Sequence, residues 1–118
     1  MKLPPVVPAT PPPDWPKDAP KLSARVWNHI LYGDYDKYAR RERSKWRGGH
    51  KYGYGWIAGG DEYPLNWEEK EIAESILKAL NYKESPVRYD MPISGGSIKV
   101  FTSRKDGRIT TAFYKKDT

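Results

Sequence analysis

Cysteine is absent from all 118 residues of the chain. Its absence excludes disulfides, a thiolate nucleophile, and zinc or iron sites built on cysteine ligands. Long apolar runs are missing as well, because no stretch of about eighteen apolar residues occurs that could cross a membrane as a helix. The first residues also lack the apolar centre of a signal peptide. We therefore expect a fold stabilised by packing alone, with no membrane span.

Acidic residues are outnumbered, with 15 Asp and Glu against 21 Lys and Arg, a net charge of +6 and a pI of about 9.5. This balance favours a polyanionic partner, which could be nucleic acid, a membrane surface or an acidic protein. Phenylalanine is scarce, with two residues against five Trp and nine Tyr. Most aromatic rings therefore carry a polar group, which suits base stacking and interfaces as well as core packing.

The chain divides into a proline-rich start and a folded remainder. Eight of the eleven prolines precede residue 21. Residues 1–20 are therefore predicted to form an extended, polyproline-like linker, and residues 21–118 a single domain.

Two helices are predicted before any strand. Ser23 is a typical N-cap, and apolar residues at positions 26, 27, 30 and 31 predict a helix to about Tyr32, with Gly33 as its stop. Asn66 followed by Glu69 resembles a capping arrangement for a second helix, which apolar spacing extends to residue 81.

Three strands are predicted to follow the helices, at Val87–Met91, Ile98–Thr102 and Ile109–Tyr114. A hairpin turn at residues 105–108 separates the last two. Helices first and an antiparallel sheet last indicate an α+β domain, in which N-terminal helices pack against a C-terminal antiparallel sheet.

The stretch from Trp27 to Trp56 holds both histidines of the chain, His29 and His50. His50 follows a glycine pair, which lets backbone approach a ligand closely. Residues 37–47, between the histidines, hold seven charged residues, six of them positive: Lys37, Arg40, Arg41, Glu42, Arg43, Lys45 and Arg47. Two imidazoles beside cations and exposed amides are the groups needed to hold a phosphodiester and transfer protons around it.

RNA cleavage by internal transfer needs no nucleophile from the protein, because the ribose 2′-OH attacks the adjacent phosphorus. One group takes the 2′ proton, a second protonates the departing 5′ oxygen, and a cation or amides stabilise the phosphorane. Two histidines and a lysine suffice, because an imidazole with an ordinary pKa of about 6.5 is kept neutral or protonated by small environmental differences. DNA lacks the 2′-OH and is predicted to be inert.

Other interpretations stay open at this point. Histidines in a small domain are commonly surface or packing residues, and a charged run is commonly only solvated. A metal site would need Asp34, Asp36 or Asp61 beside the histidines, and no ligand spacing supports one. A basic RNA-binding or partner-binding module without chemistry is the leading alternative to an enzyme.

Four motifs together resemble the bacterial EndoU-type ribonuclease domain, a C-terminal toxic domain of polymorphic and contact-dependent growth inhibition proteins. They are His29-Ile-Leu-Tyr-Gly-Asp34, Trp46-x-Gly-Gly-His50, Tyr63-Pro-x-x-Trp67 with Lys70 opening a helix, and Gly107-Arg-Ile-x-Thr111-Ala112. The resemblance covers about residues 23 to 115 and implies an EndoU, RNase A-like or barnase-like nuclease architecture. It also implies a metal-independent endoribonuclease, without a cofactor, that leaves a 2′,3′-cyclic phosphate and often prefers uridine.

The resemblance assigns catalysis to His29, His50 and Lys70, with His50 as the base and His29 as the acid. Lys51 and Lys99 are the alternatives to Lys70. Four residues are assigned to substrate binding: Thr111, Tyr114, Arg47 and Gly49. The family places a tyrosine two residues after the threonine, where this chain has Phe113 followed by Tyr114. Because neighbours on a strand face opposite ways, Tyr114 would need a bulge to reach the site.

The resemblance further implies a place and partners for the domain. It would be the C-terminal part of a larger secreted or cell-surface protein and would act in the cytoplasm of a target bacterium. Its partners would be an RNA substrate, tRNA above all, and a cognate immunity protein, which we expect to be acidic because this chain is basic. We expect the domain to be a monomer.

Overall fold

A computed structural model of the chain describes residues 12, 14–35, 46–54 and 61–117. These residues form two helices and six strands: α1 Ala24–Leu31, β1 Asp34–Tyr35, β2 Trp46–Arg47, α2 Glu69–Ala79, β3 Lys83–Ser85, β4 Arg88–Ile93, β5 Gly96–Thr102 and β6 Ile109–Lys116. Strands β3 to β6 form one antiparallel sheet in chain order, while β1 and β2 form a separate antiparallel pair. The prediction of an α+β fold is confirmed.

Helix α1 begins and ends where the sequence predicts. The Ser23 hydroxyl accepts a hydrogen bond of 3.1 Å from the amide of Val26, which satisfies one of the free donors of the first turn. At the other end Gly33 has a φ of +88°, a conformation that only glycine adopts without strain. The buried side of the helix consists of Trp27, Ile30 and Leu31.

Helix α2 begins at a different cap from the predicted one. Its N-cap is Glu68, so the prediction of Asn66 as the cap is wrong. The amide of Glu68 donates to the carboxylate of Glu71 at 3.0 Å, and the negative charges of this first turn also suit the helix dipole. No helix in the described part of the chain is long and apolar enough to cross a membrane.

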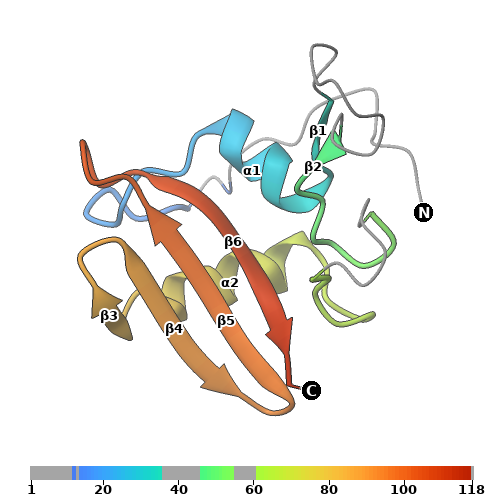
Figure 1. Cartoon of the computed structure of the whole chain (residues 1–118). Helices are drawn as coiled ribbons and strands as arrows, with labels where there is room; N and C mark the ends of the chain where they lie inside the picture. The colour runs from blue at the N-terminus through green and yellow to red at the C-terminus, as the bar shows by residue number, and fades with distance from the viewer. Residues whose placement is uncertain (1–11, 13, 36–45, 55–60, 118) are drawn as a thin grey trace.

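The core lies between the helices and one face of the sheet, here called the inner face. Helix α2 packs against β4 and β5, and α1 packs against β6. The inner face and the helices bury these apolar side chains completely: Ile30, Leu31, Ile72, Ile76, Ile98, Val100, Ile109 and Ala112. Neither of the two described helices covers the opposite face, here called the outer face, which is turned toward the viewer in Figure 1.

Two rows of side chains cross the outer face, each spanning β4, β5 and β6. Side chains alternate between the two faces along each strand, and in β5 the alternation is seen in buried Ile98 and Val100 against partly buried Lys99 and Phe101. The register of β4, β5 and β6 places their outer-face residues opposite one another in these two rows. One consists of Asp90, Lys99 and Phe113, the other of Arg88, Phe101 and Thr111.

The start of the described chain touches the domain. Trp15 packs against the core, and its indole N–H donates to the carbonyl of Pro20 at 3.1 Å. Most of the predicted linker, residues 1–11 and 13, lies outside the described residues, so its extended conformation stays a prediction.

Candidate functional site

The two histidines meet at the C-terminal end of helix α1. The last carbonyls of a helix have no partner within the helix and must find donors elsewhere. Here the amides of Gly49, His50 and Lys51 donate to the three consecutive carbonyls of residues 29–31, at 2.9, 2.7 and 3.1 Å. The segment after β2 therefore runs along the end of α1 and places His50 beside His29.

The glycine pair before His50 makes this close approach possible. Gly48 has a φ of +74°, and a Cβ at this position would lie 2.4 Å from the carbonyl oxygen of His29 and 2.8 Å from its ring. Gly49 is buried, and its amide is bonded to the same carbonyl. The sequence predicted that these glycines let backbone approach a ligand. The structure shows them against His29 instead, and the amide of Gly49 is already engaged.

The histidine rings lie within reach of a common ligand. Their centroids are 6.4 Å apart, with the ring planes at 75°. Nδ1 of His50 is 2.6 Å from the carbonyl oxygen of Asp61. Because a carbonyl only accepts hydrogen bonds, Nδ1 must carry the proton, which leaves the lone pair of the neutral ring on Nε2.

The surroundings of His50 favour its neutral form. Burial lowers the pKa of the His50 ring below the ordinary 6.5, the hydrogen bond with Asp61 opposes this effect, and the nearby charge of His29 adds to it. The ring is therefore neutral at pH 7, with Nε2 able to accept a proton. This is the state that the predicted role of His50 as a base requires.

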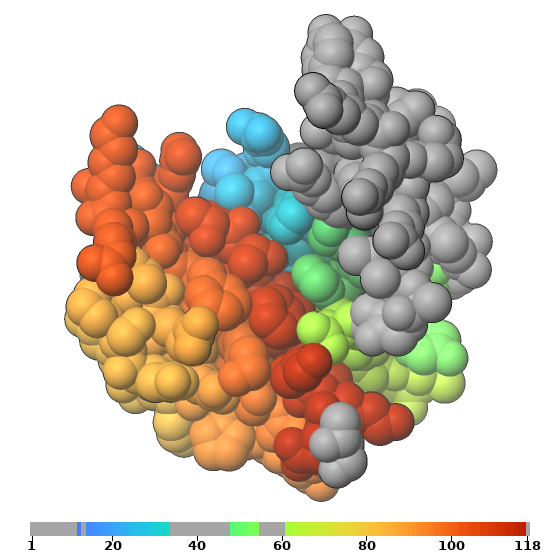
Figure 2. Space-filling model, in the orientation of Figure 1, coloured from blue at the N-terminus to red at the C-terminus, as the bar shows by residue number. Residues whose placement is uncertain are grey.

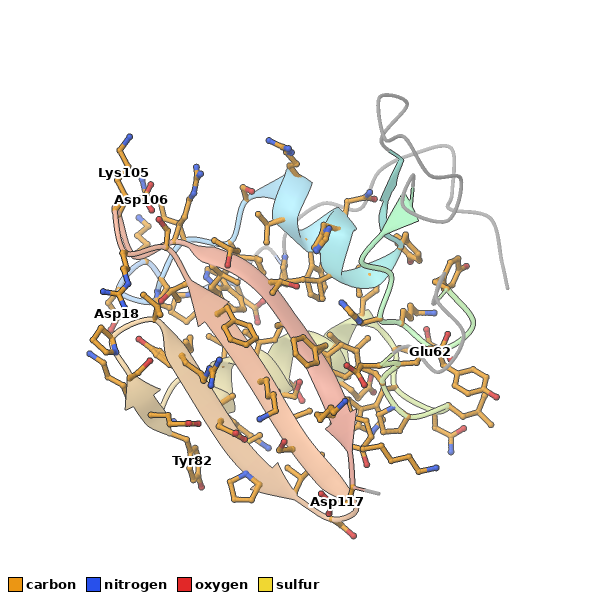
Figure 3. All side chains as sticks on the ribbon, viewed as in Figure 1. Asp18, Glu62, Tyr82, Lys105, Asp106 and Asp117 are labelled. Atoms are coloured by element: carbon orange, nitrogen blue, oxygen red, sulfur yellow. The ribbon has the colours of Figure 1, made fainter. Side chains whose placement is uncertain are left out.

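Residues 61–63 hold the His50 loop from its other side. The amide of Tyr63 donates to the carbonyl of His50 at 2.6 Å, and the carboxylate of Asp61 lies 3.6 Å from the ammonium of Lys115 on β6. The carboxylate of Glu62 accepts from the amide of Gly53 at 2.9 Å. Figure 3 shows Glu62 at this side of the molecule, with Lys105 and Asp106 far away at the β5–β6 turn.

Strand β6 places an aromatic ring beside His50. The ring of Phe113 lies 5.5 Å from that of His50, centroid to centroid, and belongs to the outer face. Thr111, two residues earlier, shares that face. Tyr114 faces the other way, where it pairs with Ile98 and packs over Gly96. A bulge does occur in β6, but it precedes Thr111, so it does not turn Tyr114 toward the histidines.

The three lysines considered for catalysis lie in different places. Lys70 is exposed on the first turn of α2, and none of its hydrogen bonds or ion pairs reaches a histidine within the described residues. The ammonium of Lys51 lies 3.5 Å from the carboxylate of Glu68. Lys99 lies on the outer face of β5 directly opposite Phe113, with its ammonium 2.5 Å from Asp90.

The basic run between the histidines lies mostly beyond the described residues. Arg47 is in β2, where its backbone lies opposite that of Asp34 in the register with β1. The other five cations of the run fall within residues 36–45, which the structure does not describe. Among the described residues no group of three or more His, Asp and Glu side chains could hold a metal ion.

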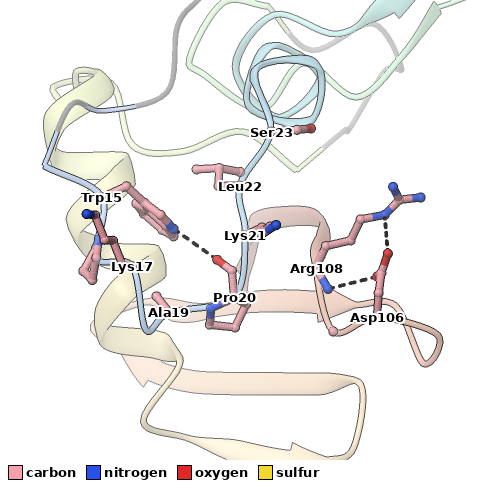
Figure 4. A pocket seen from close by; sticks show the side chains of 11 residues that line it. Trp15, Lys17, Ala19, Pro20, Lys21, Leu22, Ser23, Asp106 and Arg108 are labelled. Carbon is pink, nitrogen blue, oxygen red and sulfur yellow. Dashed lines mark hydrogen bonds and ion pairs between the residues drawn. The ribbon is translucent and has the colours of Figure 1, made fainter.

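A large groove lies away from the histidines. It has a volume of about 870 Å³ and lies between the segment from Trp15 to Ser23 and the β5–β6 turn at Asp106–Arg108 (Figure 4). Its walls carry neither histidine. We therefore attach no chemistry to it.

No family model, curated protein or solved structure matches the chain. The function must therefore be argued from the histidine site itself.

We expect Gly48→Ala to disturb the site more than Gly107→Ala. Both glycines have a φ of +74°, so alanine carries the same backbone penalty of about 1–2 kcal/mol at each. Only at position 48 does the new Cβ meet backbone, whereas nothing lies within 4 Å at Gly107. Urea denaturation should show a larger loss in the free energy of unfolding for Gly48→Ala. Equal losses would contradict the close packing on His29.

Proposed function

We propose that this chain is a metal-independent endoribonuclease, a cyclising RNA lyase whose acid and base are His29 and His50. The observation that supports the proposal is the pair of imidazoles at 6.4 Å, of which His50, protonated on Nδ1, carries its lone pair on Nε2 in a partly buried site. Catalytic hydrogen bonds span about 2.6–3.2 Å, so rings at this separation can reach two oxygens of one phosphodiester.

The proposed reaction needs only proton transfers from the protein. Nε2 of His50 takes the proton of the ribose 2′-OH, whose oxygen forms a bond to phosphorus. The bond from phosphorus to the 5′ oxygen breaks, and the protonated ring of His29 gives its proton to that oxygen. The products are a 2′,3′-cyclic phosphate and a free 5′-OH. Each proton transfer is made by an imidazole, so no step uses a metal.

A third group should stabilise the negative charge of the phosphorane. The motifs assign this role to Lys70; we favour Lys99, because it lies opposite Phe113, whose ring contacts His50. Its ion pair with Asp90 fixes the ammonium on the outer face. Lys51 follows His50 in the chain but turns its ammonium toward Glu68 and the ring of Tyr54.

The toxin role is a wider part of the same proposal. The motifs at both histidines and the net charge of +6 support an RNA substrate, tRNA first, and an acidic immunity protein as inhibitor. This proposal also includes an EndoU, RNase A-like or barnase-like architecture and a monomeric state. It further includes delivery into a target bacterium from a larger secreted protein.

A non-catalytic RNA-binding module is the second candidate. It is favoured by the outer face, where Phe101, Phe113 and Arg88 would bind RNA whether or not the histidines act.

We expect His29→Ala and His50→Asn to lose RNA cleavage by about 10²–10⁴-fold, the usual contribution of a general acid or base. Asparagine at position 50 is the matched choice, because its amide can keep the hydrogen bond to the Asp61 carbonyl while the proton acceptor is lost. Cleavage of total RNA should be followed on gels, with EDTA present, and binding of a 2′-deoxy oligonucleotide should be unchanged. If neither the wild type nor any variant cleaves RNA, the chain is a binding module rather than an enzyme. Cleavage of DNA would contradict the transfer mechanism.

The third catalytic group can be found by comparing Lys99→Ala with Lys70→Ala. If Lys99 stabilises the phosphorane, its removal should lower kcat by about 10²-fold or more, whereas Lys70→Ala should stay near the wild type because its side chain is exposed. Lys51→Ala serves as the third arm. A large loss in Lys70→Ala alone would restore the assignment made from the motifs.

The pH dependence should report the neutral state of His50. A base must be unprotonated, so kcat/KM falls on the acid side as pH drops through the pKa of this ring. Because that pKa is lowered, we expect the midpoint of the acid limb below 6.5. A midpoint at or above 6.5 would show that His50 is not the base.

A further inference from the structure

A line of side chains extends from the histidine site across the outer face. Apart from His50, these side chains have no role in the proposed reaction. Beyond His50 and Phe113, the ring of Phe101 stacks on Phe113 with centroids 5.8 Å apart and planes at 25°. The guanidinium of Arg88 then lies 5.2 Å from the centroid of Phe101. The line His50, Phe113, Phe101, Arg88 thus crosses from the edge of β6 to β4.

This line lies at the surface. Both phenylalanine side chains are partly buried, Arg88 is exposed, and neither α1 nor α2 covers them. Figure 2 shows the same face, in the orientation of Figure 1, with the side chains of β5 and β6 visible across it. These are the only two phenylalanines of the chain, and neither belongs to the core.

Flat rings beside a guanidinium match the chemistry of an unpaired nucleotide. A base stacks on an aromatic ring whatever its sequence, and arginine binds the phosphate or stacks in turn. Arg88 is available for this, because its ion pair with Glu84 is long at 4.0 Å and both side chains are half exposed. Such exposed pairs are weak. Lys99, held by Asp90, adds a second cation beside the rings.

We propose that the outer face binds single-stranded RNA next to the cleaved phosphate, with an unpaired base on Phe101 and a phosphate on Arg88. The inference rests on the proposed function for the place of the cleaved bond. It adds the substrate class, since bases within a duplex are stacked on each other and cannot lie on Phe101. The enzyme would therefore cut RNA in loops or other unpaired segments.

Binding can be tested with an RNA that is not cut. A short, fluorescently labelled 2′-O-methyl oligonucleotide of mixed sequence has no free 2′-OH, and its affinity can be measured by anisotropy at a fixed salt concentration. Phe101→Leu keeps apolar packing but removes the flat ring, and Arg88→Ala removes the charge. Arg108→Ala is the matched control, because Arg108 is also exposed and weakly paired, with Asp106 at 3.7 Å, but lies at the β5–β6 turn.

We expect Phe101→Leu and Arg88→Ala each to weaken binding of the single strand by roughly tenfold, and Arg108→Ala by no more than about twofold. The duplex form of the same oligonucleotide should bind weakly and equally to wild type and Phe101→Leu. Unchanged affinity for the single strand in both variants, or losses no larger than in Arg108→Ala, would overturn the proposal. Thermal melting checks that the variants fold, and exposed Arg88 gives an answer even if Phe101→Leu does not.

The two proposals fail in different ways. Histidine-dependent cleavage together with unchanged binding in Phe101→Leu and Arg88→Ala would keep the enzyme and remove the single-strand site. Reduced binding in both variants, with no cleavage by the wild type, would keep the site and remove the enzyme.

Discussion

Three backbone hydrogen bonds between the end of helix α1 and residues 49–51 are the interaction on which the site depends. Without them, His50 would lie on a glycine-rich segment that keeps its contacts with residues 61–63 and Phe113 but is not joined to the end of α1. The bonds satisfy helix carbonyls that would otherwise lack partners, so they serve the fold as well as the site. Because the same residues, His29 and His50, supply both backbone bonds and side chains, the imidazoles are brought together by the capping of the helix.

The two rings share a site but have different surroundings. His50 is partly buried, its Nδ1 is held by the carbonyl of Asp61, and the ring of Phe113 lies beside it. The hydrogen bond with Asp61 fixes the tautomer of the ring, and burial favours its neutral state. Acid–base catalysis needs one group that accepts a proton and another that donates one, and the proposed mechanism assigns the first role to His50, because its ring is favoured in the neutral form.

Local features of the fold were predictable, and contacts between distant segments were not. The cap at Ser23 and the strand alternation of β6 follow from neighbouring residues, so both were found in the sequence. The N-cap Glu68 was missed because glutamate is not a usual capping residue. The role of Gly48 could not be seen, since its partner is about twenty residues away in the chain. Alternation put Phe113 and Tyr114 on opposite faces, but only the fold shows that Phe113 faces His50.

The proposed mechanism requires both imidazoles to bind one phosphodiester. Nitrogen-15 NMR of the two histidine side chains, during titration with a dinucleotide whose 2′-OH is replaced by hydrogen, would show whether they do. We expect the ring signals of both His29 and His50 to move and to reach saturation at the same ligand concentration. If only one ring responds, or the two saturate at different concentrations, the histidines do not share a phosphate and the proposed mechanism is wrong.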